Sequence, residues 1–150
     1  MIKTDFSTGL TASIDIQVPF FDIDPGGVAW HGHYFKYFEV ARCELLEGVG
    51  YSYERMMETG LLWPIADTMV RYVHPLTLNK KARVTACLRE WEFRLVIDYK
   101  VEDEAGKILT RGRTVQVPVE AESLELRLGS PQELIDKVQA KLRETGLAAD

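Results

Sequence analysis

The stretch HGHYFKYFEVARCELL, residues 31–46, places its apolar residues at the spacing of an amphipathic helix. Together with the tryptophan that precedes it, the apolar side chains recur every three or four positions and so share one face. That face consists of Trp30, Tyr34, Tyr37, Phe38, Ala41 and Leu45, and Lys36, Glu39, Cys43 and Glu47 lie on the other side. We predict a helix over about residues 31–46, closed by Gly48 or Gly50. A largely aromatic face needs a broad apolar surface to cover it, so we interpret these side chains as core.

Predicted strands on both sides of the helix supply that surface. Residues 11–18 alternate between apolar and polar side chains, as a half-buried strand does. Four further strands are expected at residues 63–74, 82–88, 93–101 and 108–119. The first of these four alternates poorly, which is typical of a strand with both faces partly covered. The segment DEAGK, residues 103–107, supplies a hairpin turn, and Gly112 in the last strand would let another backbone approach closely.

A short helix is predicted near the end of the chain. Ser130-Pro131-Gln132-Glu133 has the pattern of a capping box with proline at the first helical position, and the helix should run to about Arg143. One strand, one long helix, four antiparallel strands and a short helix together predict a two-layer α+β domain. The helix covers one face of the sheet. The other face or the sheet edges remain for association, so we expect a dimer.

Composition and charge exclude several classes of protein. The 150 residues suit one domain, with a core at about residues 11–119 and a strand and helix extension at 120–150. No apolar run approaches the ~18 residues of a membrane span and no secretory signal is evident, so we expect a cytoplasmic protein that does not bind membranes. The net charge of -5 disfavours nucleic-acid binding. Cys43 and Cys87 lie far apart without metal-binding or redox spacing, so no metal is expected.

The segment DIDPGGVAWHGHY, residues 22–34, gathers titratable groups around a Pro-Gly-Gly turn at the start of the predicted helix. Amide N–H groups in the first turn of a helix lack intrahelical partners and carry partial positive charge, so those around His31 could polarise a carbonyl and stabilise its oxyanion. Asp24 would then attack this carbonyl or activate a water, and His31 could assist proton transfer. The alternative is that Asp24 is simply a turn residue. Asp22 is interpreted as a turn or strand-end residue.

The pattern D-x-D-P-G-G-V-A-W-H-G-H-Y, followed by F-K-Y-F-E-V-A-R, resembles the signature of hot-dog-fold acyl-CoA thioesterases of the 4-hydroxybenzoyl-CoA thioesterase type. The segment RYVHPLTLNKKARVTACL, residues 71–88, is also similar to that family, and the resemblance covers roughly residues 11–119. It implies a long central helix wrapped by a curved antiparallel sheet, with subunits in dimers that often form tetramers. The implied reaction is hydrolysis of a thioester to a free acid and coenzyme A. No cofactor is implied, because coenzyme A is part of the substrate and product.

The resemblance also assigns roles to individual residues. The family's catalytic carboxylate falls on Asp24, and the residue whose backbone amide polarises the thioester carbonyl falls on His31. Phe20 stands where some relatives carry a tyrosine, so no hydroxyl role is expected at that position. Substrate contacts are expected from Gly27, Trp30, Tyr34 and Trp63, with the two tryptophans as candidates for lining an acyl pocket. A thioester suits this arrangement because the thiolate leaves readily, and no GxSxG motif is present.

Coenzyme A carries phosphates, so an acidic protein needs local basic groups to hold it. The candidates are Lys80, Lys81, Arg89 and Arg94, although each could equally be a solvated surface residue. The acyl group is expected to be aromatic or short to medium in length. Two alternatives remain: a hot-dog module that binds acyl thioesters without hydrolysing them, and a hydratase or dehydratase. The second would pair a histidine with an acid on the facing helix, which the D-P-G-G turn does not resemble.

Overall fold

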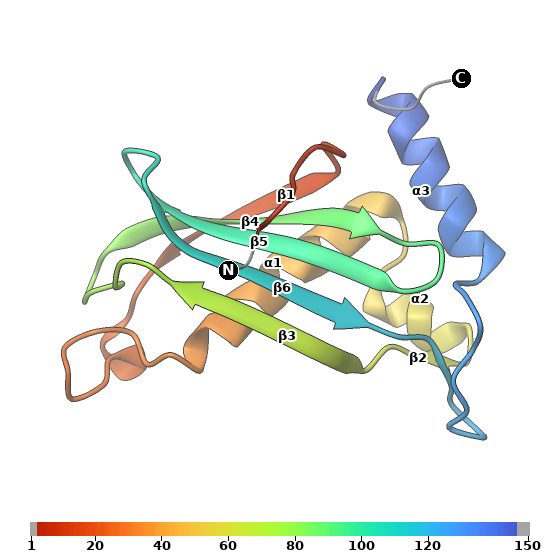
Figure 1. Cartoon of the computed structure of the whole chain (residues 1–150), viewed down its shortest axis with the longest axis horizontal. Helices are drawn as coiled ribbons and strands as arrows, with labels where there is room; N and C mark the ends of the chain where they lie inside the picture. Colours follow the sequence, from red (N-terminus) through yellow and green to blue (C-terminus); the bar gives the residue numbers. More distant parts are fainter. Residues whose placement is uncertain (1–2, 147–150) are drawn as a thin grey trace.

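A five-stranded antiparallel sheet with one long helix across one face dominates the computed structural model, which describes residues 3–146 (Figure 1). The strands lie in the order β1-β4-β5-β6-β3. Their bounds are Thr11–Gln17 for β1, Ile65–Tyr72 for β3, Lys81–Glu90 for β4, Leu95–Asp103 for β5 and Ile108–Gln116 for β6. The long helix α1, His33–Val49, packs against β1 and β4. The predicted α+β class, with a long helix against an antiparallel sheet, is confirmed.

Smaller elements complete the fold at the far end of α1. They are the helix α2 (Tyr53–Glu58) and a two-stranded sheet of β2 (Leu61–Leu62) and β7 (Val119–Glu120). A 3-10 turn, η1 (Phe20–Asp22), follows β1. None of these was predicted, because segments of two to six residues are too short to show a period.

The C-terminal helix α3 spans Gln132–Glu144, close to the predicted bounds. The predicted capping box is wrong, however. Pro131 occupies the N-cap position without a side-chain cap, and the buried Ser130 hydroxyl has no partner among residues 3–146. The Ser130 N–H donates instead to the carbonyl of Glu92, so this serine belongs to the preceding loop.

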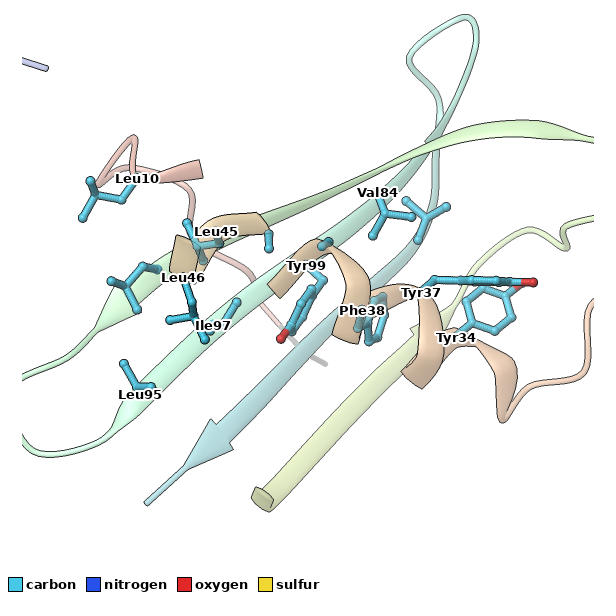
Figure 2. Close-up of a cluster of buried hydrophobic side chains, with 14 of the residues drawn as sticks. Leu10, Tyr34, Tyr37, Phe38, Leu45, Leu46, Val84, Leu95, Ile97 and Tyr99 are labelled. Carbon is cyan, nitrogen blue, oxygen red and sulfur yellow. The ribbon is translucent and has the colours of Figure 1, made fainter. Parts of the chain in front are cut away.

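The helix α1 begins two residues after the predicted start, with Gly32 at its N-cap, and ends at Gly50. Trp30 therefore lies outside the helix and is 47% exposed, which corrects its assignment to the core. The remaining members of the apolar face are buried as predicted, and several are drawn in Figure 2. They are Tyr34, Tyr37, Phe38, Ala41 and Leu45.

Gly112 in β6 allows a close approach, but by a side chain rather than by backbone. A β-carbon at this position would lie 2.6 Å from the ring of Phe38. That ring is fully buried and stacks on Tyr99 of β5, with 4.4 Å between ring centroids (Figure 2). The prediction of a backbone contact at Gly112 is therefore wrong, and the glycine instead makes room for the central aromatic residue of α1.

Gly112→Ala should lower the free energy of unfolding by about 1–3 kcal/mol, because the added methyl overpacks a ring that cannot move aside. Chemical denaturation would measure the loss. Gly48→Ala is the matched control, since Gly48 lies within α1 and a β-carbon there would meet no atom within 4 Å. That control should be neutral or stabilising, by up to about 1 kcal/mol. Equal stability of both variants would contradict the packing argument.

Within residues 3–146, the strand β3 lies at the edge of the sheet and pairs with β6 alone. Its residues are mostly exposed, so the expectation that both faces of this strand are partly covered is wrong for a single chain. Exposed apolar side chains on it include Ile65, Met69 and Tyr72. The strand thus offers an unpaired edge to another molecule.

The outer face of the sheet, opposite α1, is partly covered by the N-terminal segment. The Asp5 N–H donates to the carboxylate of Asp98 at 2.7 Å, and Arg113 donates to the carbonyl of Lys3 at 2.8 Å. Asp98 is fully buried there and is held by the Arg113 guanidinium at 2.6 Å. The face that was expected to be free for association is thus partly occupied by the chain itself. Among residues 3–146, no helix is long and apolar enough to cross a membrane.

Candidate functional site

The Pro-Gly-Gly segment forms the tip of a small hairpin, residues 22–30, that leads into α1. The Trp30 N–H donates to the Asp22 carbonyl at 3.0 Å, and the Asp24 N–H donates to the Val28 carbonyl at 2.9 Å. Gly27 has a left-handed backbone, with φ of 81°, a conformation that favours glycine. The turn alone therefore explains this glycine, and its contact with substrate stays a prediction. The hairpin lies at the start of α1, at one end of the sheet (Figure 1).

The two carboxylate oxygens of Asp24 have different surroundings. Oδ1 accepts from the Gly26 N–H at 2.8 Å and lies 3.5 Å from the Val28 nitrogen, so it braces the turn. Oδ2 accepts no hydrogen bond from residues 3–146, and the residue is half-buried. Asp24 is therefore a turn residue through one oxygen and has the other available for chemistry. The two interpretations of this residue do not exclude each other.

The peptide N–H of His31 is an available donor with fixed neighbours. The Trp30 carbonyl accepts from the His33 N–H at 2.9 Å, and the His31 carbonyl accepts from the Tyr72 hydroxyl at 2.7 Å. Within residues 3–146 the His31 N–H itself donates to no acceptor. His31 thus lies just before α1, in a turn held on both sides, rather than in the first helical turn as expected. An ordered, unbonded N–H of this kind is what oxyanion stabilisation requires.

Two of the predicted substrate contacts lie next to this turn. The exposed indole of Trp30 packs against the rings of His31 and His33, with centroids 4.9 and 5.4 Å apart. Tyr34 is buried beneath Tyr72, with 4.9 Å between ring centroids. Burial raises the pKa of the Tyr34 hydroxyl, so it stays neutral at physiological pH. Trp30 is therefore exposed beside the turn, and Tyr34 is packed in the core behind it; their contacts with substrate stay predictions.

Trp63 is not brought to the hairpin. Its indole lies against Tyr51, which follows the C-terminal end of α1, with 6.3 Å between centroids. A helix of 17 residues is about 25 Å long. Trp30 precedes its first residue and Trp63 packs on Tyr51 after its last residue, so the two tryptophans lie at opposite ends of α1. Within one chain the two tryptophans do not line the same pocket.

The four predicted phosphate-binding residues do not form one cluster. Lys81 and Arg89 lie at opposite ends of β4, eight residues and roughly 26 Å apart. Arg89 faces the buried Asp98 at 3.7 Å, and Arg94 pairs with Glu90 at 3.4 Å. Lys80 and Lys81 line surface hollows that also contain acidic side chains, among them Asp103 and Glu104. The structure therefore supports no single phosphate site made from these four residues.

The buried acid of the hairpin is Asp22, which sequence reasoning treated as a turn or strand-end residue. It is 2% exposed and accepts hydrogen bonds from Lys36 and Tyr37 of α1. Burial alone would raise the pKa of Asp22, but these two hydrogen bonds and the lysine charge hold that pKa below its usual value. This pair is hard to recognise in the sequence. Its only sign is that Asp22 precedes the Pro-Gly-Gly turn and that Lys36 lies among aromatic residues at the start of α1.

Known proteins resemble this chain in sequence and in fold. The sequence profile of the thioesterase-like superfamily matches residues 18–142. YneP of Bacillus subtilis (strain 168), provisionally named an acyl-CoA thioesterase, is 27% identical over 112 residues, covering 74% of this chain and 81% of that protein.

Solved structures agree with the fold. DHNA-CoA thioesterase from Staphylococcus aureus is 26% identical, with a TM-score of 0.77 over 93% of this chain and 97% of its own. A 4-hydroxybenzoyl-CoA thioesterase, 18% identical, has a TM-score of 0.74 over 85% of this chain and 97% of its own. The expected hot-dog fold is confirmed.

Proposed function

The chain belongs to the thioesterase-like superfamily and is a thioester hydrolase, and we propose that its substrates are aryl- or short- to medium-chain acyl-CoA thioesters. The observation that carries the proposal is the pairing of an open Asp24 Oδ2 with an unbonded His31 N–H on either side of one hairpin. A carboxylate and a fixed N–H are sufficient for a thioester, whose thiolate leaves without help from a strong acid.

In the proposed reaction the His31 N–H binds the carbonyl oxygen of the thioester and stabilises the charge that develops there. Oδ2 of Asp24 either attacks the carbonyl carbon, giving an anhydride that water opens, or takes a proton from the attacking water. In both routes the C–S bond breaks and coenzyme A leaves as the thiolate. The exposed indole of Trp30 would contact the acyl group or the thioester arm. The chemistry uses groups of this chain and the substrate, and no further cofactor is part of the proposal.

A thiol-release assay over aryl-, short-chain and long-chain acyl-CoAs tests this function directly. We expect turnover with aryl or short to medium acyl groups. The rival that the protein only binds acyl thioesters predicts binding without thiol release. A hydratase or dehydratase would instead change the acyl chain of an enoyl or β-hydroxyacyl thioester and leave the thioester bond intact.

We further propose that the protein forms a homodimer through the edge of β3, and that two dimers assemble into a tetramer through other surfaces. The unpaired edge of β3 and its exposed apolar residues, Ile65 and Met69 among them, support pairing of two sheets at this strand. Tyr72, the last residue of the same strand, reaches the His31 carbonyl, so such an interface would adjoin the proposed site. A cytoplasmic location is retained in the proposal, and the free thiols of Cys43 and Cys87 are compatible with it.

Tyr72→Phe should lower kcat about threefold to tenfold, because one hydrogen bond that fixes the His31 peptide is lost. KM should change little, since the hydroxyl is engaged with the backbone. Tyr51→Phe is the matched control, because its hydroxyl lies beyond the other end of α1, 3.5 Å from the Thr59 hydroxyl. Steady-state thiol release measures both variants. An equal loss in both would contradict a specific role of Tyr72.

A further inference from the structure

The carboxylate of Asp22 gathers donors from the first two turns of α1. Lys36 Nζ lies 2.8 and 2.9 Å from its two oxygens, and the Tyr37 hydroxyl donates at 2.5 Å. His33 Nε2 approaches to 3.7 Å. A buried carboxylate is costly unless such partners surround it, so this acid is tied firmly to the helix.

The backbone of the same residue holds the hairpin. The Asp22 carbonyl accepts from the Trp30 N–H at 3.0 Å, which closes the hairpin at its base. Asp24 follows Asp22 by two residues on one arm, and His31 follows Trp30 directly on the other. Both proposed reacting groups therefore lie within two residues of the pair that Asp22 anchors to α1.

Asp22 itself is not placed to meet a substrate. Its side chain is 2% exposed, and both of its oxygens already accept hydrogen bonds. Its effect on the reaction must therefore pass through other residues. Errors of about 1 Å in the placement of reacting groups are enough to cost two orders of magnitude in rate.

We propose that Asp22 is a positioning residue, whose carboxylate locks the hairpin of residues 22–30 onto α1 and so fixes the separation between the Asp24 carboxylate and the His31 N–H. The inference rests on the proposed function, in which these two groups act on one carbonyl carbon. On α1, Lys36 and Tyr37 donate the hydrogen bonds that hold this carboxylate.

Asp22→Asn tests the proposal. The asparagine side chain keeps the shape of aspartate, but its NH₂ group cannot accept the hydrogen bonds that Lys36 and Tyr37 donate. We expect kcat to fall about 10- to 100-fold with KM changed less than threefold. Asp98→Asn is the matched control: Asp98 is also fully buried and bound by an arginine, but on the outer face of the sheet. It should lose comparable stability and keep kcat. Folded fractions from circular dichroism at the assay temperature correct both rates.

A second measurement separates positioning from general stability. In an Asp24→Asn background, Asp22→Asn should lower the residual rate no more than threefold, because the group that it positions is already gone. If Asp22→Asn fails to fold, Lys36→Gln takes its place, since Lys36 is half-exposed; kcat should then fall about threefold to tenfold.

Two results would overturn the proposal. One is an unchanged kcat in a destabilised Asp22→Asn protein. The other is a further fall in the rate by about 10- to 100-fold when Asp22→Asn is added to Asp24→Asn. Absence of thiol release by the unmutated protein would instead refute the proposed function, before any variant is compared.

Discussion

Asp24→Asn should lower kcat for acyl-CoA hydrolysis by about 10³-fold or more while acyl-CoA binding persists. The amide oxygen of the variant can still accept from the Gly26 N–H, so the turn is retained. The amide nitrogen replaces the open Oδ2, and it can neither attack a thioester nor take a proton from water. Thiol release at saturating substrate measures the rate, and calorimetric titration with acyl-CoA measures binding in the same preparation.

Asp15→Asn is a suitable control, because Asp15 is an exposed acid on β1 that pairs with Arg83 at 3.1 Å. It should leave kcat unchanged. If Asp24→Asn keeps more than a tenth of the original kcat, Asp24 is only a turn residue. With the unmutated protein, a single turnover in ¹⁸O-labelled water tests the anhydride route, because label in the Asp24 carboxylate indicates an anhydride that water opens at the aspartyl carbon.

His31→Pro should lower kcat by about 10²- to 10³-fold, because it removes the N–H proposed to stabilise the oxyanion. The backbone can accept this change. His31 follows Trp30 in a turn closed by the bond from the His33 N–H to the Trp30 carbonyl, a position where proline is favoured. The His31 N–H has no acceptor within residues 3–146, so no intramolecular hydrogen bond is lost. Steady-state thiol release measures the effect.

His31→Ala is the matched control, since both variants lose the imidazole but only proline loses the N–H. The alanine variant should retain kcat within about tenfold of the original value, because it keeps the N–H that stabilises the oxyanion. Equal losses in both variants would assign the role to the imidazole rather than to the backbone. Near- and far-ultraviolet circular dichroism spectra check that both variants are folded.

Periodicity predicted the architecture, because long elements repeat their burial pattern several times. The aromatic face of α1 and the alternating strands β1, β4 and β5 were predicted in this way. Their ends were less accurate: α1 was placed two residues early, since the turn before it carries the same aromatic composition. The elements α2, β2 and β7 were missed, because so few residues show no local pattern. They are specified by contacts of α2 with α1 and β2, and by the pairing of β2 with β7.

The candidate site was predicted as a segment and not as a set of partners. Asp24 and His31 lie on one hairpin, so proximity in the sequence was a sufficient guide. Asp22 was undervalued because its partners lie 14 and 15 residues away, on a helix whose rotation about its axis decides whether they meet. Trp63 was overvalued for the converse reason: its chemistry suits an acyl pocket, but the chain carries it to the other end of α1.

The N-terminal segment that lies across the outer face of the sheet is joined to it over very long stretches of chain. Asp5 meets Asp98, 93 residues later, and Lys3 meets Arg113, 110 residues later. Closing loops of that size is slow, because the entropy of the intervening chain is lost before the contact forms. During synthesis Asp5 must therefore wait until β5 has emerged from the ribosome, and Lys3 until β6 has emerged. A nascent chain that stops short of β6 lacks Arg113, so the Lys3 carbonyl has lost this donor and the buried Asp98 has lost the guanidinium that binds it.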